Sequence, residues 1–196
     1  MAWVVVGLGN PGEEYESTRH NTGRMALEYY AKKAGASDWK EEKRSQSLTT
    51  GTHVGKTLLA LVLPNTFMNK SGAAVAKFVK SQRAAESLIV LYDDLDLPLG
   101  KIKISFDRGS GGHKGIESIT RAVKTKRFTR IRIGVSPETP TGKLKKPQGE
   151  DEVVKFILAR FKSAEMDELK KIFKKVGEAI DAIVADGPTI AMNKFN

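Results

Sequence analysis

Residues 3–23 read W-V-V-V-G-L-G-N-P-G-E-E-Y-E-S-T-R-H-N-T-G, and this stretch sets the expectation for the fold. The β-branched run at its start predicts a buried strand over Val4–Val6. A glycine-rich turn that presents Asn10 follows, and then a polar loop that presents His20. Catalytic side chains are often carried by loops at strand ends, so Asn10 and His20 become candidate site residues.

The glycines at positions 7, 9 and 12 match the G-x-G-x-x-G pattern of dinucleotide-binding proteins. In those proteins a helix begins at once and packs on the sheet, but residues 13–22 contain only one large apolar side chain, Tyr15. The acidic residue expected about 20 positions further on is also missing, because Glu28 lies within an amphipathic helical pattern. We therefore expect no nucleotide cofactor.

Length and composition indicate one ordinary globular domain. The chain has 196 residues, of which 40% are hydrophobic and 29% charged, and it has no cysteine. Disulfides, thiolate metal sites and a cysteine nucleophile are thereby excluded. The sequence has neither an apolar run of membrane-spanning length nor a start typical of a signal peptide. We expect a cytoplasmic monomer.

The charge balance is strongly basic. Lys and Arg number 33 against 23 Asp and Glu, which gives a formal charge of +10. Such a surplus favours a polyanionic partner, most simply a nucleic acid. A lysine-rich solvated surface explains the same surplus equally well.

Strand and helix patterns alternate along the chain. Strands are predicted over residues 56–63, 87–92, 101–106 and 131–135, and weak alternation over 38–56 predicts short antiparallel strands. Helices are predicted after Gly23, near Ser71 and around 116–123, and two more over 150–186 follow a basic loop at 137–148. Together these predict a single α/β domain over residues 1–196, with three layers and a mixed, twisted sheet that carries helices on both faces.

The chain has three histidines. His53 lies in a weakly alternating strand region and His113 in a second glycine-rich turn, where its role could be structural. His20 has polar neighbours, Arg19 and Asn21, and we expect it to be exposed in its loop. An exposed histidine suits proton transfer near neutral pH, although one without any function would fit the same pattern.

Carboxylates follow the strand predicted to end at Tyr92. In the run Asp93-Asp94-Leu95-Asp96 one of them could orient a histidine, or all could simply make local turn hydrogen bonds. A magnesium site is disfavoured because no G-x-x-x-x-G-K-[ST] phosphate loop accompanies the run. No serine lies in a G-x-S-x-G elbow either. We expect no metal and no other cofactor.

Four blocks resemble, in order and spacing, the signatures of bacterial-type peptidyl-tRNA hydrolases. They are G-L-G-N-P-G with His20, P-N-T-F-M-N-K-S-G, Y-D-D-L-D-L-P-L-G and G-S-G-G-H-K-G, and they span residues 3–116. The resemblance implies hydrolysis of the ester between a peptide and the 3′-terminal ribose of tRNA.

The resemblance also implies roles for individual residues. His20 would be the general base, oriented by Asp93, while Asn10 and Asn69 would hold the peptide and the ester carbonyl. The further residues that it assigns to substrate or tRNA binding are Tyr15, Phe67, Met68, His113, Lys114, Lys103 and Arg132. The physics is consistent, because an ester has a better leaving group than an amide and water with a histidine base can suffice.

Two positions depart from the family pattern. Lys114 stands where many bacterial members have asparagine, and Ser105 stands where a lysine is proposed to help Arg132 clamp the tRNA 5′-phosphate. Lys103 lies one pleat period away on the same strand face and is the candidate to substitute for that lysine. The alternative function is a non-catalytic RNA-binding protein on the same scaffold, which would explain the charge and the fold equally well.

Overall fold

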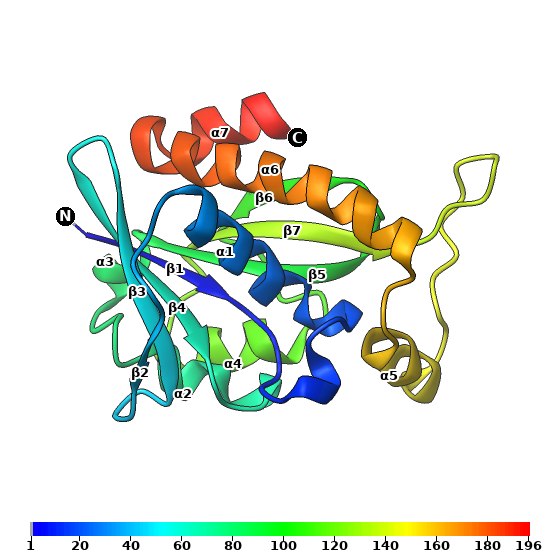
Figure 1. Ribbon diagram of the computed structural model, residues 1–196, viewed down its shortest axis with the longest axis horizontal. Coiled ribbons are helices and arrows are strands. Elements are labelled where there is room, and N and C mark those ends of the chain that lie inside the picture. Colours follow the sequence, from blue (N-terminus) through cyan, green and yellow to red (C-terminus); the bar gives the residue numbers. More distant parts are fainter. Residues whose placement is uncertain (1) are drawn as a thin grey trace.

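The computed structural model describes residues 2–196 and contains a seven-stranded sheet. The strands are β1 (Trp3–Gly7), β2 (Lys40–Glu42), β3 (Ser47–Val54), β4 (Thr57–Pro64), β5 (Leu88–Pro98), β6 (Ile102–Phe106) and β7 (Thr129–Ser136). Their order across the sheet is β2-β3-β4-β1-β5-β7-β6 (Figure 1). The four strands β4, β1, β5 and β7 are parallel, whereas β2, β3 and β6 pair antiparallel to their neighbours. The predicted mixed sheet is confirmed.

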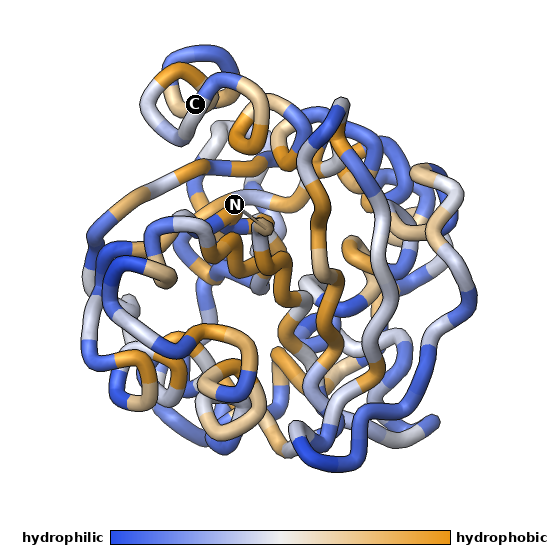
Figure 2. The backbone as a smooth tube through the Cα atoms, turned by 90° about the vertical axis from the view of Figure 1, so that its left-hand side faces the viewer, coloured by the Kyte–Doolittle hydropathy of each residue, from blue (hydrophilic) through white to orange (hydrophobic). Residues whose placement is uncertain are grey.

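Helices cover both faces of the sheet. The α-helices are α1 (Thr22–Lys33), α2 (Ser71–Val75), α3 (Gln82–Ala85), α4 (Lys114–Val123), α5 (Glu150–Leu158), α6 (Ser163–Asp186) and α7 (Pro188–Phe195). Short 3₁₀ helices are η1 (Glu13–Tyr15), η2 (Arg19–Asn21) and η3 (Met68–Lys70). Buried side chains of α1, α6 and α7 pack on one face of the sheet, and those of α2 and α4 pack on the other. The central strands are accordingly the most hydrophobic part of the trace (Figure 2).

Three elements differ from the sequence-based expectation. Two helices were predicted after the basic loop, but Gly187 and Pro188 end α6 and begin a third, α7, because proline is well suited to a first helical position. The strand predicted to end at Tyr92 continues as β5 to Pro98, through a register shift against β7. Conversely, the apolar stripe of Val75, Phe78 and Val79 predicts that the helix near Ser71 continues to Val79, but α2 ends at Val75 and turns follow it.

The parallel strands bring Asn10, Asn69 and Asp93 to the end of the sheet where these strands finish. Parallel sheets bind ligands beyond the carboxyl ends of their strands, and this edge carries the segments after β1 and β4 and the second half of β5. Gly23 allows α1 to start against β5, since a Cβ on Gly23 would lie only 2.1 Å from the carbonyl oxygen of Leu91. This close approach brings η2, just before α1, to β5. Among residues 2–196 there is no helix long and apolar enough to span a membrane.

Candidate active site

A cavity of about 370 Å³ lies at this edge, and we call it the histidine cavity. Its polar lining includes His20, Asp93, His113 and Lys114. Much of its apolar lining comes from α5, through Val153, Val154 and Ile157. The cavity therefore combines titratable side chains with apolar side chains of α5.

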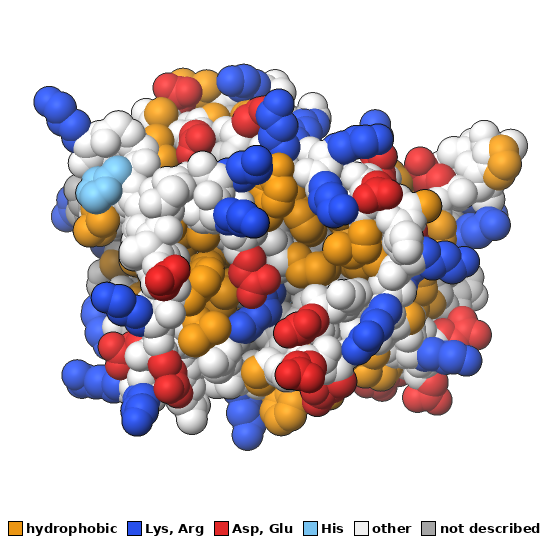
Figure 3. Space-filling view, in the orientation of Figure 1, with side chains coloured by type: hydrophobic (Ala, Val, Ile, Leu, Met, Phe, Trp, Pro, Cys, Tyr) orange, Lys and Arg blue, Asp and Glu red, His pale blue; other side chains and the backbone are white. Residues whose placement is uncertain are grey.

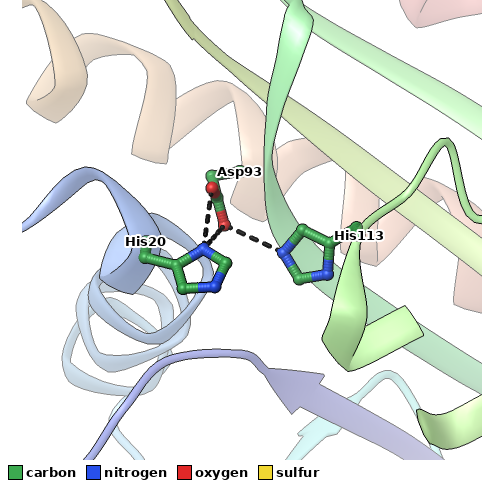
Figure 4. A group of neighbouring side chains, drawn as sticks. All are labelled: His20, Asp93 and His113. Carbon is green, nitrogen blue, oxygen red and sulfur yellow. Dashed lines mark hydrogen bonds and ion pairs between the residues drawn. The ribbon is translucent and has the colours of Figure 1, made fainter. Parts of the chain in front are cut away.

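Asp93 joins two histidines that are far apart in the sequence (Figure 4). The Nδ1 atom of His20 lies 3.0 Å from Oδ2 and 3.1 Å from Oδ1 of Asp93. The Nε2 atom of His113 lies 3.1 Å from Oδ1 of the same carboxylate. The side chain of Asp93 is only 2% exposed, so both interactions are shielded from water.

The hydrogen bonds define the tautomers of both rings. His113 is the N-cap of α4 and its Nδ1 accepts a hydrogen bond from the backbone N–H of Ile116, so its Nε2–H donates to Asp93. His20 donates through Nδ1–H to the same carboxylate, which leaves the lone pair on its Nε2 available. No residue among 2–196 forms a hydrogen bond with that Nε2. His20 therefore carries the arrangement of a general base.

The electrostatics match this arrangement. Burial raises the pKa of Asp93, but His20 and His113 outweigh burial and hold this pKa well below its usual range. Burial lowers the pKa of His20, while the Asp93 carboxylate more than compensates, so the net pKa of His20 lies above 6.5. The nearby positive charge of Lys114 acts in the opposite direction and lowers it.

His20, Asp93 and His113 also form a geometric candidate for a metal site, because their ligand atoms lie within 4.8 Å of one another. The donor chemistry does not fit a cation. The Nδ1 atom of His113 already accepts an N–H, so binding a metal through Nε2 would require the ring to lose its remaining proton. The three residues are better matched to holding protons.

Asn10 presents an oriented amide after β1. Its backbone exchanges two hydrogen bonds with the side chain of Asn21, at 2.8 and 2.9 Å. Its side-chain Oδ1 accepts the backbone N–H of Met68 at 2.9 Å. Among the described residues, none accepts a hydrogen bond from Nδ2. Asn10 therefore offers a hydrogen-bond donor rather than an acceptor.

The other predicted contacts near β4 have different environments. Met68 is only 4% exposed and packs in the core, where its backbone supports Asn10, so its side chain does not provide a substrate-facing surface. Phe67 is 57% exposed and Asn69 is also exposed. Tyr15 is half-buried in η1.

Arg132 and Lys103 lie outside the histidine cavity. They are direct partners across β6 and β7 and line, with Arg108, a second cavity of about 430 Å³ that we call the cationic cavity. The Nε of Arg132 donates to Asp94 at 2.6 Å. Ser105 also lines this cavity but is buried and has no charge. The two cavities share a wall that includes Tyr92, Asp94, Ser110 and Gly111.

Lys114 connects the histidine cavity to the α5 region. It is the first residue of α4, its side chain is 64% exposed, and its Nζ lies 3.3 Å from Oε1 of Glu150. A second exposed ion pair joins Lys146 of the basic loop to Asp96 of β5. The first pair links the start of α5 to α4, and the second links the loop before α5 to β5.

The expected exposure of His20 was wrong. Its residue is only 9% exposed, because residues 18–22 are packed between the sheet edge and the segment that joins α5 to α6. Sequence reasoning assigned no packing to this polar stretch and also missed Arg108 and the α5 side chains. Arg19 is only 7% exposed and pairs with Glu165, and no local sequence pattern signals this burial.

The fold and the site define an α/β protein with a buried histidine–carboxylate pair suited to acid–base catalysis. A family model described as peptidyl-tRNA hydrolase matches residues 4–196. The chain is 40% identical to the peptidyl-tRNA hydrolase of Thermodesulfovibrio yellowstonii over 98% of each chain. It is 37% identical to that of Aquifex aeolicus over 98% of this chain and 95% of the relative.

Solved structures agree with the sequence comparisons. The crystal structure of peptidyl-tRNA hydrolase from Acinetobacter baumannii has a TM-score of 0.87 and 30% identity, covering 100% of this chain and 94% of the other. The chain belongs to the peptidyl-tRNA hydrolase family. The family predicted from the four sequence blocks is thereby confirmed.

Proposed function

We propose that this chain hydrolyses the ester between a peptide, or an N-blocked amino acid, and the 3′-terminal ribose of tRNA, with His20 as the general base. The membership in the family supports the reaction. The observation that carries the role of His20 is its buried hydrogen bond from Nδ1 to Asp93 at 3.0 Å. That bond leaves Nε2 as the acceptor for a proton from water.

In the proposed reaction His20 Nε2 takes a proton from water as the water oxygen attacks the acyl carbon. The resulting imidazolium is stabilised by Asp93, whose carboxylate is kept ionised by its two histidine partners. The bond from the acyl carbon to the ribose oxygen then breaks, and the imidazolium returns its proton to that oxygen. The products are a free carboxylic acid and tRNA, and the cycle needs neither a covalent nucleophile nor a metal.

Asn10 supplies the complementary charge stabilisation in this scheme. Its Nδ2–H group can donate to the carbonyl oxygen as negative charge develops there, and Asn69 offers a second, more exposed amide. A donor of this kind contributes about 3 kcal/mol to the transition state. Because Oδ1 of Asn10 already accepts the Met68 N–H, Asn10 offers only its Nδ2–H donor to the substrate. A free substrate ammonium is itself a donor and would meet this N–H without an acceptor. We therefore expect a preference for blocked amino groups.

The tRNA would be held along the neighbouring surface. Exposed Phe67 and half-buried Tyr15 can contact its 3′ end, and the cationic cavity can accept a phosphate through Lys103, Arg108 and Arg132. In this assignment Lys103 and Arg108 supply the positive charge that Ser105 lacks.

The four lysines on α6 are weaker candidates for tRNA contact; they are Lys170, Lys171, Lys174 and Lys175. Lys170 and Lys171 pair with Asp167 and Glu168 on the same helix. In Figure 3, blue cationic side chains are interspersed with red acidic ones across the face that carries α1 and α6. We include in the proposal that the enzyme acts as a monomer in the cytoplasm, with tRNA as its macromolecular partner.

The decisive test is single-turnover hydrolysis of N-acetyl-aminoacyl-tRNA by His20→Ala. We expect a loss on the order of 10²–10⁴-fold with tRNA binding nearly unchanged. His53→Ala is the matched control, because His53 is exposed and lies on β3, and it should keep the wild-type rate. If the wild-type protein bound tRNA but released no acyl group, the non-catalytic RNA-binding alternative would replace this proposal.

A further inference from the structure

Arg19, the residue directly before His20, makes an unusual set of buried contacts. Its side chain is only 9% exposed, and Nη2 donates to Oε1 of Glu165 at 2.7 Å. Nη1 donates to the carbonyl oxygens of Ala159 and Arg160, at 3.2 and 3.1 Å. The guanidinium thus satisfies the carbonyl groups that follow α5 and, at the same time, pairs with the first turn of α6.

Aromatic rings complete the environment of this cation. The guanidinium carbon lies 4.6 Å from the ring centre of Phe156 on α5 and 4.8 Å from that of Phe161 in the α5–α6 connection. Cation–π contacts of this kind become stronger as water is excluded. Lysine could replace the charge here but not the planar group that donates in several directions.

The backbone reinforces the same junction. The N–H of Arg19 donates to the carbonyl oxygen of Ala159 at 3.2 Å, and the N–H of Phe161 donates to that of Ser17 at 3.0 Å. Thr18 and Arg160 form an isolated antiparallel bridge. Figure 1 shows α5 beside the early loop of the chain and set apart from the helices that cover the sheet. The α5 end nearest Arg19 is therefore its buried attachment.

The opposite end of α5 is attached more weakly. The Lys114–Glu150 pair has side chains that are 64% and 82% exposed, and the Lys146–Asp96 pair is 48% and 53% exposed. Exposed ion pairs contribute little to stability. None of the α5 residues is itself buried. The position of α5 over the histidine cavity depends mainly on the junction that Arg19 organises.

We infer that Arg19 is a positioning residue that fixes His20 and the apolar α5 wall of the histidine cavity relative to each other. Arg19 is covalently joined to His20, and its side chain holds the helix whose Val153, Val154 and Ile157 line the same cavity as that histidine. The inference rests on the proposed catalytic role of His20. A small displacement of a reacting group can cost about 10²-fold in rate, so such a link affects chemistry more than binding.

The experiment compares Arg19→Gln, Arg19→Lys and Glu165→Gln with the control Ile183→Ala. Ile183 is fully buried in the same helix as Glu165 but 18 residues further along, roughly 27 Å away at the usual helical rise. For each protein we would measure the melting temperature, the affinity for deacylated tRNA, the single-turnover rate at saturating substrate and the methyl NMR shift of Ile157. Ile157 reports directly on the α5 wall.

For Arg19→Gln we expect a rate loss of roughly 10–100-fold, a tRNA affinity within about twofold of wild type, and a shifted Ile157 methyl signal. Arg19→Lys should retain part of the rate because it keeps the charge, and Glu165→Gln should lose less than Arg19→Gln because the two carbonyl contacts remain. Ile183→Ala should lower the melting temperature while leaving the rate and the Ile157 signal at their wild-type values.

A wild-type rate and Ile157 signal in the Arg19 variants would overturn the inference. So would changes that Ile183→Ala reproduces at a matched loss of melting temperature. If Arg19→Gln does not fold, the milder Arg19→Lys and Glu165→Gln decide in the same way. Absence of turnover in the wild type would defeat the proposed function instead, whereas the Ile157 shift needs no substrate and would still test the coupling.

Discussion

Asp93 and Asp94 are neighbours on β5 and hold cationic or proton-donating partners in two different ways. Asp93 binds the buried His20 and the half-buried His113 in the histidine cavity. Asp94 pairs at 2.6 Å with Arg132, whose side chain is 24% exposed at the cationic cavity. Asp94 lies on the wall that the two cavities share, so one strand serves both of them.

The Asp94–Arg132 pair of the cationic cavity is more exposed than the Asp93–His20 pair of the histidine cavity, and this difference suits the two cavities to different functions. Buried hydrogen bonds are strong and geometrically specific, so the histidine cavity suits a chemical step that depends on one proton position. Half-exposed cations act over a distance, are screened by salt and can replace one another, so the cationic cavity suits phosphate binding. Variants in the first should change the rate, and variants in the second should change the affinity.

The largest effect should come from Asp93→Asn. The amide can donate to Nδ1 of His20 and so place the ring proton on Nε2, where it blocks the base. We expect the single-turnover rate to fall on the order of 10²–10⁴-fold with little change in tRNA affinity. Asp94→Asn is the matched neighbour and should mainly change tRNA binding rather than the rate, because Asp94 pairs with Arg132. Equal rate losses in both variants would remove the distinction between the two carboxylates.

The next largest effect concerns Asn10. Loss of its donor in Asn10→Ala should slow the hydrolysis of N-acetyl-aminoacyl-tRNA about 10²-fold, equivalent to about 3 kcal/mol. In Asn10→Asp a carboxylate would attract a free substrate ammonium, so the preference for blocked over unblocked substrates should shrink or reverse. The ratio of the hydrolysis rates on blocked and unblocked aminoacyl-tRNA tests this. An unchanged ratio in Asn10→Asp would show that another group recognises the substrate amine.

A smaller and purely electrostatic effect is expected in the cationic cavity. Arg132→Gln should weaken tRNA binding roughly tenfold and reduce the slope of log K against log salt by about 0.7–0.9, the value of one phosphate contact. The rate at saturating substrate should stay within a few-fold of wild type. Lys174→Gln on α6 is the control for general charge loss and should leave the slope nearly unchanged. If Arg132→Gln left the slope of log K against log salt unchanged, the phosphate would have to bind elsewhere.

The smallest effect should come from Lys114→Asn. Lys114 lines the histidine cavity, but its side chain is largely exposed, like most of the cations expected to bind phosphate. Its exposed pair with Glu150 contributes little stability, so the fold should be unaffected. We expect weaker substrate binding, a flatter salt dependence and a nearly intact chemical step. Because the charge of Lys114 lowers the pKa of His20, its removal should also move the acidic limb of the rate profile to higher pH. A large loss of the saturated rate with an unchanged KM would instead show that Lys114 takes part in the chemistry.

The sequence predicted what depends on local pattern. Alternation and β-branched runs located the strands, the local hairpin pattern indicated the mixed sheet, and the four blocks identified the family. The conjunction of His20 with Asp93 could be expected only through the resemblance, because nothing local relates residues 73 positions apart.

The remaining features depend on tertiary contacts between polar groups. His20 was expected to be exposed because its neighbours are polar, yet Arg19 is buried by hydrogen bonds to the α5–α6 junction, and Thr18 forms a β-bridge with Arg160 there. His113, the second partner of Asp93, is held in place because it is the N-cap of α4 and accepts the Ile116 N–H. Hydrophobic periodicity does not predict such a contact. Hydrophobic patterns reveal an apolar core, but they give no signal for a buried segment whose packing is mostly polar.

The most direct measurement compares the titration of His20 with the pH dependence of the reaction. NMR of the wild-type imidazole gives the pKa of His20, and single-turnover rates across the same pH range give the pKa of the catalytic base. We expect both to lie above 6.5 and to coincide, with the rate falling as pH drops and His20 becomes protonated. A rate that stays constant while His20 titrates would contradict its role as the general base.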